Sequence, residues 1–165
     1  MPVYLLTVKR MYNPDRTDLE ILRLLEQDGR MSHKVIAQTV HKSITPVHSR
    51  ISKLEKSGFI RKITALINPK LIGRGLTAYT QVLLKVHSQE SLENFIAEAV
   101  KIKEVMECYH MTGTFDFLLR ITIRDMEAYN ELLLKQLSNL PAVAQMQTFF
   151  VISEAKYETA YFNTV

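Results

Sequence analysis

A cluster of turn residues near the middle of the chain divides it into two halves. Pro69, Gly73 and Gly75 all fall within residues 68–75, and no other central stretch concentrates turn chemistry in this way. Before the cluster, apolar residues recur at helical spacing. After it, segments with strand-like alternation are mixed with helical ones. The chain is therefore expected to form two domains joined at residues 68–75.

The formal charge changes sign at the same boundary. Residues 1–75 hold 14 Lys and Arg against 6 Asp and Glu, whereas residues 76–165 hold 7 against 11, so the two halves carry +8 and −4. An asymmetry of this kind indicates that the first half meets a polyanion. Charge alone leaves open the alternative of a solvated basic surface with no partner.

The overall composition is that of an ordered protein that stays off the membrane. Of 165 residues, 47% are hydrophobic and 23% are charged, and no apolar run approaches the roughly 18 residues that span a bilayer. The first ten residues show no cleavable signal. The single Cys108 excludes an internal disulfide and a cysteine-rich metal site. These observations predict a cytoplasmic location.

The first half is predicted to form three short helices followed by a strand. The helices cover residues 15–28, 33–40 and 43–57, with Ser32 and Ser43 as N-caps and Gly58 as a left-handed stop. Residues 59–67 are β-branched and basic and are expected to form a strand or wing. This order is typical of a winged helix-turn-helix. The residues expected to point inward from the first two helices are Leu19, Ile21, Leu22, Leu25, Val35, Ile36 and Val40.

The second half is predicted to be a ferredoxin-like βαββαβ domain. Strands are expected at residues 76–87, 104–111, 115–123 and 143–152, with amphipathic helices around residues 92–100 and 125–140. The strands are apolar on both faces, and helices can cover only one of them. A second copy of the chain is the simplest cover for the other face, so we expect a homodimer.

The fold class is therefore α+β, with an N-terminal winged helix-turn-helix followed by a C-terminal domain for ligand sensing and dimerisation. The expected domain limits are an N-terminal extension at 1–14, a DNA-binding domain at 15–67, a linker at 68–75 and the βαββαβ domain at 76–165.

The third predicted helix has a narrow apolar stripe and a polar opposite face. Val47, Ile51 and Leu54 are spaced to be buried together. The opposite face carries hydroxyl, imidazole and ammonium groups, and Glu55 is the only acid on the helix. Such groups can contact base edges and phosphates of double-stranded DNA, whereas a merely solvated face usually mixes charge signs. The candidate DNA contacts, with the helix start and the basic pair of the wing, are Ser43, Thr45, His48, Ser49, Ser52, Lys53, Lys56, Arg61 and Lys62.

Several motifs in order resemble the leucine-responsive/asparagine-regulator (Lrp/AsnC) family over nearly the whole chain from Asp15. They are DRTDLEIL at 15–22, DGRMS at 28–32, SITPV at 43–47, Arg50, LEKSGFI at 54–60 and ECYHMTGTFDFLL at 107–119. The resemblance implies a transcription regulator controlled by a small effector, commonly an amino acid. It also implies dimers that often assemble to octamers.

The resemblance places the effector between subunits, near the loop that joins the second and third strands. Here this loop is residues 109–116. Gly113 allows a close approach of backbone and ligand, and Asp116 could accept hydrogen bonds from an α-ammonium. The alternative, of equal weight, is that the loop is a tight turn in which Asp116 stabilises its own loop. The candidate effector contacts are Tyr109, Thr112, Gly113, Thr114, Phe115 and Asp116.

Three departures from the family pattern concern the DNA-binding half. His41 and Lys42 replace a Gly and an apolar residue in the turn before the recognition helix, so that either the turn is looser or His41 is left-handed. Ile44 replaces a Pro. The long start, residues 1–13, leaves open an added strand, an arm towards DNA, or disorder.

Other functions are less well supported by the residues. The alternative is an enzyme similar to siroheme decarboxylases, which share the two-domain plan, and His110 and Arg120 are residues of the kind those enzymes carry there. A protein that kept the fold but lost DNA binding is disfavoured by the basic helix face. The five histidines have no metal-ligand spacing and Cys108 is expected to be a small buried hydrophobe, so we expect no catalytic residue, no metal and no cofactor.

Overall fold

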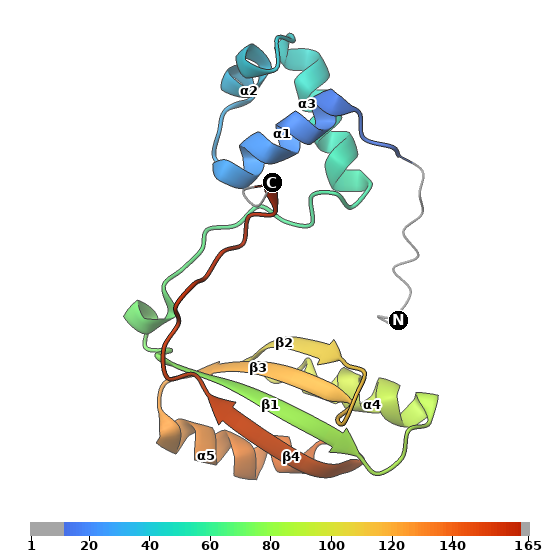
Figure 1. The fold of residues 1–165 in the computed structure, drawn as a ribbon, viewed down its shortest axis with the longest axis vertical. Helices are drawn as coiled ribbons and strands as arrows, with labels where there is room; N and C mark the ends of the chain where they lie inside the picture. The colour runs from blue at the N-terminus through green and yellow to red at the C-terminus, as the bar shows by residue number, and fades with distance from the viewer. Residues whose placement is uncertain (1–11, 163–165) are drawn as a thin grey trace. The chain divides into compact units, whose positions relative to one another are not determined.

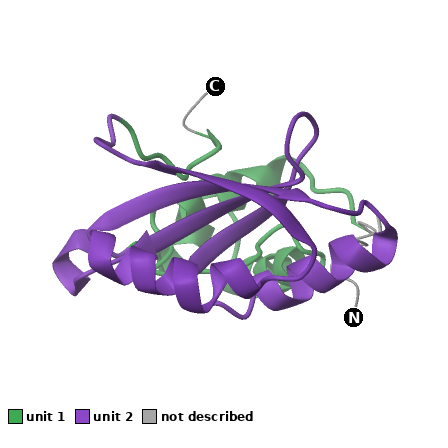
Figure 2. Cartoon of the chain, turned by 90° about the horizontal axis from the view of Figure 1, so that it is seen from below, with its two compact units in different colours: residues 1–66, 156–165 green, residues 67–155 purple. Residues whose placement is uncertain are grey.

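The computed structural model describes residues 12–162, and the chain forms two compact units (Figures 1 and 2). One unit comprises residues 1–66 with 156–165, and the other comprises residues 67–155. The expected limits at 67/68 and 75/76 lie close to this division, but the end of the chain groups with the first unit rather than the second.

The helical unit contains α1 (Arg16–Gln27), α2 (His33–Thr39) and α3 (Ile44–Lys56). The Asp15 side chain caps α1 by accepting the backbone N–H of Asp18, and Ser32 caps α2 by accepting that of Val35. Gly58 ends α3 with a φ of 82°, as expected for a left-handed stop. The buried core of the unit consists of Ile21, Leu24, Ile36, Ala37, Val47, Ile51 and Leu54.

Two of the residues expected to point inward are in fact exposed. Leu19 is 44% exposed and Val35 is 46% exposed, while Leu24 and Ala37 are buried instead. Leu19 lies about 200° around the helix from Ile21, and Val35 about 100° from Ile36. Only one side of each short helix faces the small core, so these offsets place both side chains outside it.

Of the strand or wing predicted for residues 59–67, the strand does not form in the described structure. The segment belongs to no strand, and every residue from 61 to 67 is exposed. A strand needs the backbone of a neighbouring strand to accept and donate its ladder hydrogen bonds. Among the described residues of the helical unit, no segment provides one.

The second unit has the predicted βαββαβ order and forms one antiparallel sheet. Its strands are β1 (Leu76–Leu84), β2 (Val105–His110), β3 (Phe117–Ile123) and β4 (Val143–Phe150), in the spatial order β2-β3-β1-β4. Helices α4 (Gln89–Ala99) and α5 (Met126–Lys135) cover one face of this sheet (Figure 1). Two 3-10 turns, η1 (Pro69–Ile72) and η2 (Leu137–Asn139), precede β1 and follow α5.

The face of the sheet under α4 and α5 holds the larger core. Alternate residues of the two central strands point into it and are fully buried, as the period of two requires. Phe95 of α4 stacks on Phe117 of β3 with ring centroids 4.5 Å apart. The fully buried members from the sheet are Ala78, Thr80, Val82, Phe117, Leu119 and Ile121.

The opposite face of the sheet is mixed rather than uniformly apolar, which corrects the expectation of strands apolar on both faces. Tyr79 and Phe149 are Cα partners there and are 36% and 48% exposed. Next to them, Gln81 is the Cα partner of Gln147. The strands alternate as expected, but amides and an ion pair share the open face with the apolar side chains.

The end of the chain is tied to α1 within the helical unit. The backbone N–H groups of Tyr161 and Phe162 donate to the two carboxylate oxygens of Glu26, at 2.6 and 2.7 Å. The sequence placed residues up to 165 with the second half because no local pattern reports such a long-range contact.

No helix in the described part of the chain is long and apolar enough to cross a membrane.

Candidate nucleic-acid interface and effector pocket

The recognition-helix candidate, α3, buries the predicted stripe and exposes the predicted face. Val47, Ile51 and Leu54 are 0%, 5% and 0% exposed. On the opposite side, Ser52 is half-buried and the other candidates on the helix are exposed. The exposed set consists of Thr45, His48, Ser49, Lys53 and Lys56.

The turn before α3 adopts the left-handed alternative considered for His41. His41 has a φ of 53°. Its N–H donates to the Gln38 carbonyl, and the Lys42 N–H donates to the Ala37 carbonyl at 2.9 Å. This pair of bonds is a Schellman motif, which closes the end of α2. The turn is thus regular despite lacking glycine.

Ser43 occupies the N-cap position of α3, but its side chain accepts no capping hydrogen bond from the described residues. Its hydroxyl is exposed at the start of the helix. Arg61 and Lys62 are exposed as well, in the extended segment after the helix. All three stay available for contacts with a partner.

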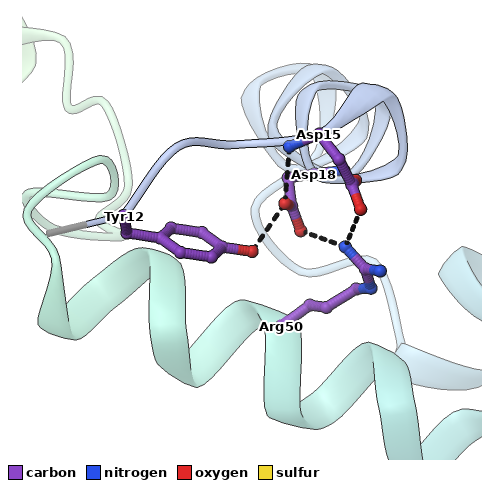
Figure 3. A network of polar contacts seen from close by, with 4 residues as sticks. All are labelled: Tyr12, Asp15, Asp18 and Arg50. Atoms are coloured by element: carbon purple, nitrogen blue, oxygen red, sulfur yellow. Dashed lines mark hydrogen bonds and ion pairs between the residues drawn. The ribbon is translucent and has the colours of Figure 1, made fainter.

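A polar network around the buried Asp18 carboxylate ties α3 to the start of α1 (Figure 3). Arg50 Nη1 donates to Asp15 Oδ2 at 2.7 Å and to Asp18 Oδ1 at 2.8 Å, and the Asp18 side chain is only 1% exposed. Asp18 Oδ2 also accepts the Asp15 N–H and the Tyr12 hydroxyl. The Asp18 and Asp15 carboxylates raise the pKa of Arg50 further above its ordinary range. Arg50 is therefore committed to holding the helix rather than to a partner.

Two of the candidate DNA contacts have aromatic neighbours. The His48 ring meets the His33 ring of α2 edge-on, with centroids 5.3 Å apart. The Lys53 ammonium lies 5.0 Å from the centroid of the Tyr12 ring. Lys53 and Lys56 also stand in the last turn of α3, where the helix dipole favours cations.

The loop between β2 and β3 is anchored through Asp116. Its carboxylate accepts the Leu84 N–H at 2.7 Å and lies 3.0 Å from His87 Nε2, and the side chain is 14% exposed. Its backbone N–H donates to the Val82 carbonyl. These contacts join the end of the loop to β1 and to His87, which follows β1. Gly113, at the tip of the loop, has a φ of 118°, which side-chain-bearing residues rarely adopt.

A pocket of about 210 Å³ opens beside this loop on the open face of the sheet. It brings Thr114 and Phe115 together with side chains from the adjacent strands β1 and β4. Tyr109 points elsewhere: its hydroxyl donates to Glu107, which also pairs with Arg120 at 2.6 Å. The hydrogen bond from Arg120 lowers the pKa of Glu107. The side chains lining the pocket are Gln81, Leu83, Thr114, Phe115, Gln145 and Gln147.

Comparison with known families accounts for both units. Residues 14–61 match the family described as winged helix-turn-helix DNA-binding, and residues 77–161 match the Lrp/AsnC ligand binding domain. The leucine-responsive regulatory protein of Salmonella typhimurium strain LT2 is 37% identical over 142 residues, covering 86% of this chain and 87% of that protein. This chain belongs to the Lrp/AsnC family of transcription regulators. The protein of the same name from Escherichia coli K12 has the same identity and coverage.

Solved structures of Lrp/AsnC regulators have the same fold. The transcriptional regulator NMB0573 of Neisseria meningitidis, in complex with L-Met, is 32% identical with a TM-score of 0.81, covering 89% of this chain and 95% of that one. An AsnC family regulator from Agrobacterium tumefaciens is 30% identical with a TM-score of 0.82, covering 92% and 100%. The winged helix-turn-helix and the α+β ligand-binding domain predicted from the sequence are thereby confirmed.

The pocket side chains contributed by β1 and β4 of this Lrp/AsnC chain were not among the sequence candidates. Gln81 and Leu83 alternate on β1, and Gln145 and Gln147 alternate on β4, so each pair shares a sheet face. The alternating pattern of each strand could have identified its pair as sharing one face of the sheet. The pairing of β1 with β4, which brings the two pairs together, becomes visible only in the sheet.

Cys108, predicted to be a small buried hydrophobe, is partly buried in the ligand-binding domain. It packs against the larger core, and burial raises the pKa of its thiol to about 11. Within residues 12–162, no group of three His, Cys, Asp or Glu side chains is placed to hold a metal ion.

Proposed function

We propose that this Lrp/AsnC regulator reads double-stranded DNA with the outer face of α3 and uses the basic pair after it for the phosphate backbone. The observation that carries the proposal is the exposed, cation-bearing face of α3 opposite a fully buried stripe. Lys53, Lys56, Arg61 and Lys62 supply positive charge for phosphates. Ser43, Thr45, His48, Ser49 and Ser52 supply short donors and acceptors that fit base edges or phosphates.

Fluorescence anisotropy with a labelled duplex at several salt concentrations tests this interface. Lys53→Ala and Lys56→Ala should weaken binding to all sequences alike, and each should reduce the log–log salt slope by about 0.9. Lys103→Ala is a matched control, because Lys103 is an exposed lysine of the ligand-binding domain. Changes at His48 or Ser49 should alter the preference between sequences instead. Unchanged affinity and slope in both lysine variants contradict the proposal.

We further propose that a small effector, an amino acid, binds beside the β2–β3 loop. Amide and hydroxyl groups of Gln81, Gln147 and Thr114 surround a pocket of about 210 Å³, a volume suited to a ligand smaller than a drug molecule. Phe115 and Leu83 give it apolar walls. The N. meningitidis relative was solved with L-Met, which supports this effector class. Tyr109, Thr112, Gly113 and Asp116 stay candidate contacts, because a subunit partner is expected to complete the site.

Thermal-shift measurements with each proteinogenic amino acid test the effector site. We expect at least one to raise the melting temperature, and Gln147→Leu to reduce that shift by removing hydrogen-bonding groups from the pocket. Gln38→Leu, an exposed glutamine of α2, is the matched control. If no amino acid stabilises the wild type, the proposed effector class is wrong.

The assembly proposed for this chain is a homodimer through the open sheet face, with dimers assembling to octamers. Tyr79 and Phe149 present exposed aromatic surface there, and the Arg120–Glu107 pair lies on the same face. Phe149→Glu should shift the protein towards monomers in sedimentation velocity, since a carboxylate is costly to bury at an interface. A wild-type protein that is monomeric at micromolar concentration contradicts the proposal.

We propose that the protein acts in the cytoplasm and has no enzymatic activity. The relatives reported above carry the names of regulators, and they lend no support to the siroheme-decarboxylase alternative. A spectral change on mixing with siroheme, followed by turnover, would reverse this ranking.

A further inference from the structure

Tyr12 lies ahead of α1, in the segment for which the sequence left open an added strand, an arm towards DNA or disorder, and it contacts the recognition helix. It is half-buried and packs against the core of the helical unit. Its ring meets the Phe59 ring edge-on, with centroids 6.3 Å apart. The same ring lies 5.0 Å from the Lys53 ammonium. The Tyr12 side chain thus reaches both α3 and the segment that follows it.

The position of the Tyr12 ring is held by a hydrogen bond to a buried carboxylate. The hydroxyl donates to Asp18 Oδ2 at 2.6 Å, and the Asp18 side chain is 1% exposed. This bond raises the pKa of Tyr12 to about 12. Asp18 also accepts a hydrogen bond from Arg50 of α3 (Figure 3). Tyr12 is therefore connected to α3 in two ways, through its hydroxyl by way of Asp18 and through the contact of its ring with Lys53.

An aromatic ring under an exposed lysine limits the places its ammonium can occupy. A lysine side chain loses rotamer entropy when it is fixed, and a cation over a ring face is attracted to the ring. The ring lies against one side of the ammonium. The ammonium has three N–H donors, so another side of it can face a phosphate. Lys56 lies in the same last turn of α3 but does not contact an aromatic ring among the described residues.

We infer that Tyr12 is a positioning residue for DNA binding, whose ring holds the Lys53 ammonium on the outer face of α3 in place for a phosphate. Tyr12, which precedes α1, therefore belongs to the DNA-binding machinery. The inference rests on the proposed DNA-reading face and adds to it a residue outside the helix-turn-helix itself.

A pair of double-mutant cycles on the full chain tests the inference. The probe is a labelled mixed-sequence duplex of about 30 base pairs, long enough for two half-sites. Tyr12→Leu should weaken binding about two- to fivefold, whereas Tyr12→Phe, which keeps the ring but loses the hydroxyl bond that holds it, should weaken binding less. In a Lys53→Ala background Tyr12→Leu should have no further effect. In a Lys56→Ala background its effect should persist in full.

Several outcomes would overturn the inference, and they differ from those that would overturn the proposed function. An equal loss in both lysine backgrounds, or a loss in Tyr12→Phe equal to that in Tyr12→Leu, makes Tyr12 merely structural. If Lys53→Ala weakens binding but Tyr12→Leu does not, only the inference fails. If Lys53→Ala itself has no effect, the proposed role of Lys53 fails first. Should Tyr12→Leu not fold, the Lys53 ε-proton shifts decide the matter, because the ring must move them upfield in wild type and in Tyr12→Phe.

Discussion

His41 is the residue at which this chain departs most visibly from good turn chemistry. The Schellman motif at the end of α2 requires a left-handed residue, and here a histidine takes it at a φ of 53°. A side-chain-bearing residue in this region costs about 1 kcal/mol or more relative to glycine. The His41 and Lys42 N–H groups donate to the Gln38 and Ala37 carbonyls in this turn.

His41→Gly is therefore expected to stabilise the helical unit by about 1 kcal/mol, because glycine adopts the left-handed region without strain. Thermal unfolding followed by circular dichroism measures the change. Gln38→Gly is the control inside α2 and should lose about 1 kcal/mol. A His41→Gly variant less stable than wild type would show that the imidazole makes a contact that outweighs the strain.

The hydroxyl of Tyr12 gives a second residue-scale prediction, in alkaline solution. The folded-state pKa is raised from 10.0 to about 12, so the contribution to stability is complete below pH 10 and is lost as the pH rises through 12. The wild type should thus lose more stability over this window than Tyr12→Phe. Parallel melting curves from both proteins measure the difference, with exposed Tyr157→Phe as the control. Identical alkaline slopes would exclude the hydrogen bond to Asp18.

At the scale of elements, the contact between α1 and α3 combines an apolar stripe with a charged tie. The stripe of Val47, Ile51 and Leu54 was predictable from spacing alone. The tie was not, because Arg50 lies 35 residues from Asp15 and 32 from Asp18 along the chain. Such a tie fixes how far α3 rotates about its own axis, and hence which side chains form its outer face.

Arg50→Ala is expected to destabilise the protein by about 2 to 4 kcal/mol, since it leaves the buried Asp18 carboxylate without its cation. Denaturant unfolding of the full chain measures this loss. Arg23→Ala is a matched control, because the Arg23 guanidinium lies 4.0 Å from Glu20 on an exposed surface and should contribute less than about 1 kcal/mol. Equal effects of the two substitutions would show that the tie adds nothing beyond a surface pair.

At the scale of the whole molecule, the chain passes between the two units twice. It leaves the helical unit after residue 66 and returns to it at residue 156. The returning segment is held by the Glu26 carboxylate through the N–H groups of Tyr161 and Phe162.

Glu26→Ala should release this segment. Chymotrypsin cuts the peptide bond after Tyr161, and the N–H of that bond, on Phe162, donates to Glu26. Without this hydrogen bond, cleavage there should accelerate roughly tenfold. Mass spectrometry of timed digests measures it, and cleavage after exposed Tyr157 serves as the internal reference. Glu20→Ala is the control on the same helix. A rate at Tyr161 that does not change would mean that the segment is not held in solution.

Local patterns carried much of the fold and part of the site. Helices α1 to α5 and the four strands were predicted within a few residues, because caps, glycine stops and apolar spacing are properties of neighbouring residues. The exposed face of α3 followed from the same periodicity. At Leu19 and Val35 periodicity predicted buried side chains that are in fact exposed, because only one side of each short helix faces the small core.

The sequence by itself determined that this chain is an Lrp/AsnC regulator with a helix-turn-helix half and a βαββαβ half. Only the tertiary structure showed that Arg50 and Tyr12 hold α3, that three glutamines meet in one pocket, and that the end of the chain returns to α1. It also showed that residues 59–67 lack a strand partner in the described chain. The physical reason is distance along the chain: caps and stripes involve residues a few positions apart, whereas these contacts join residues whose meeting depends on how whole elements pack.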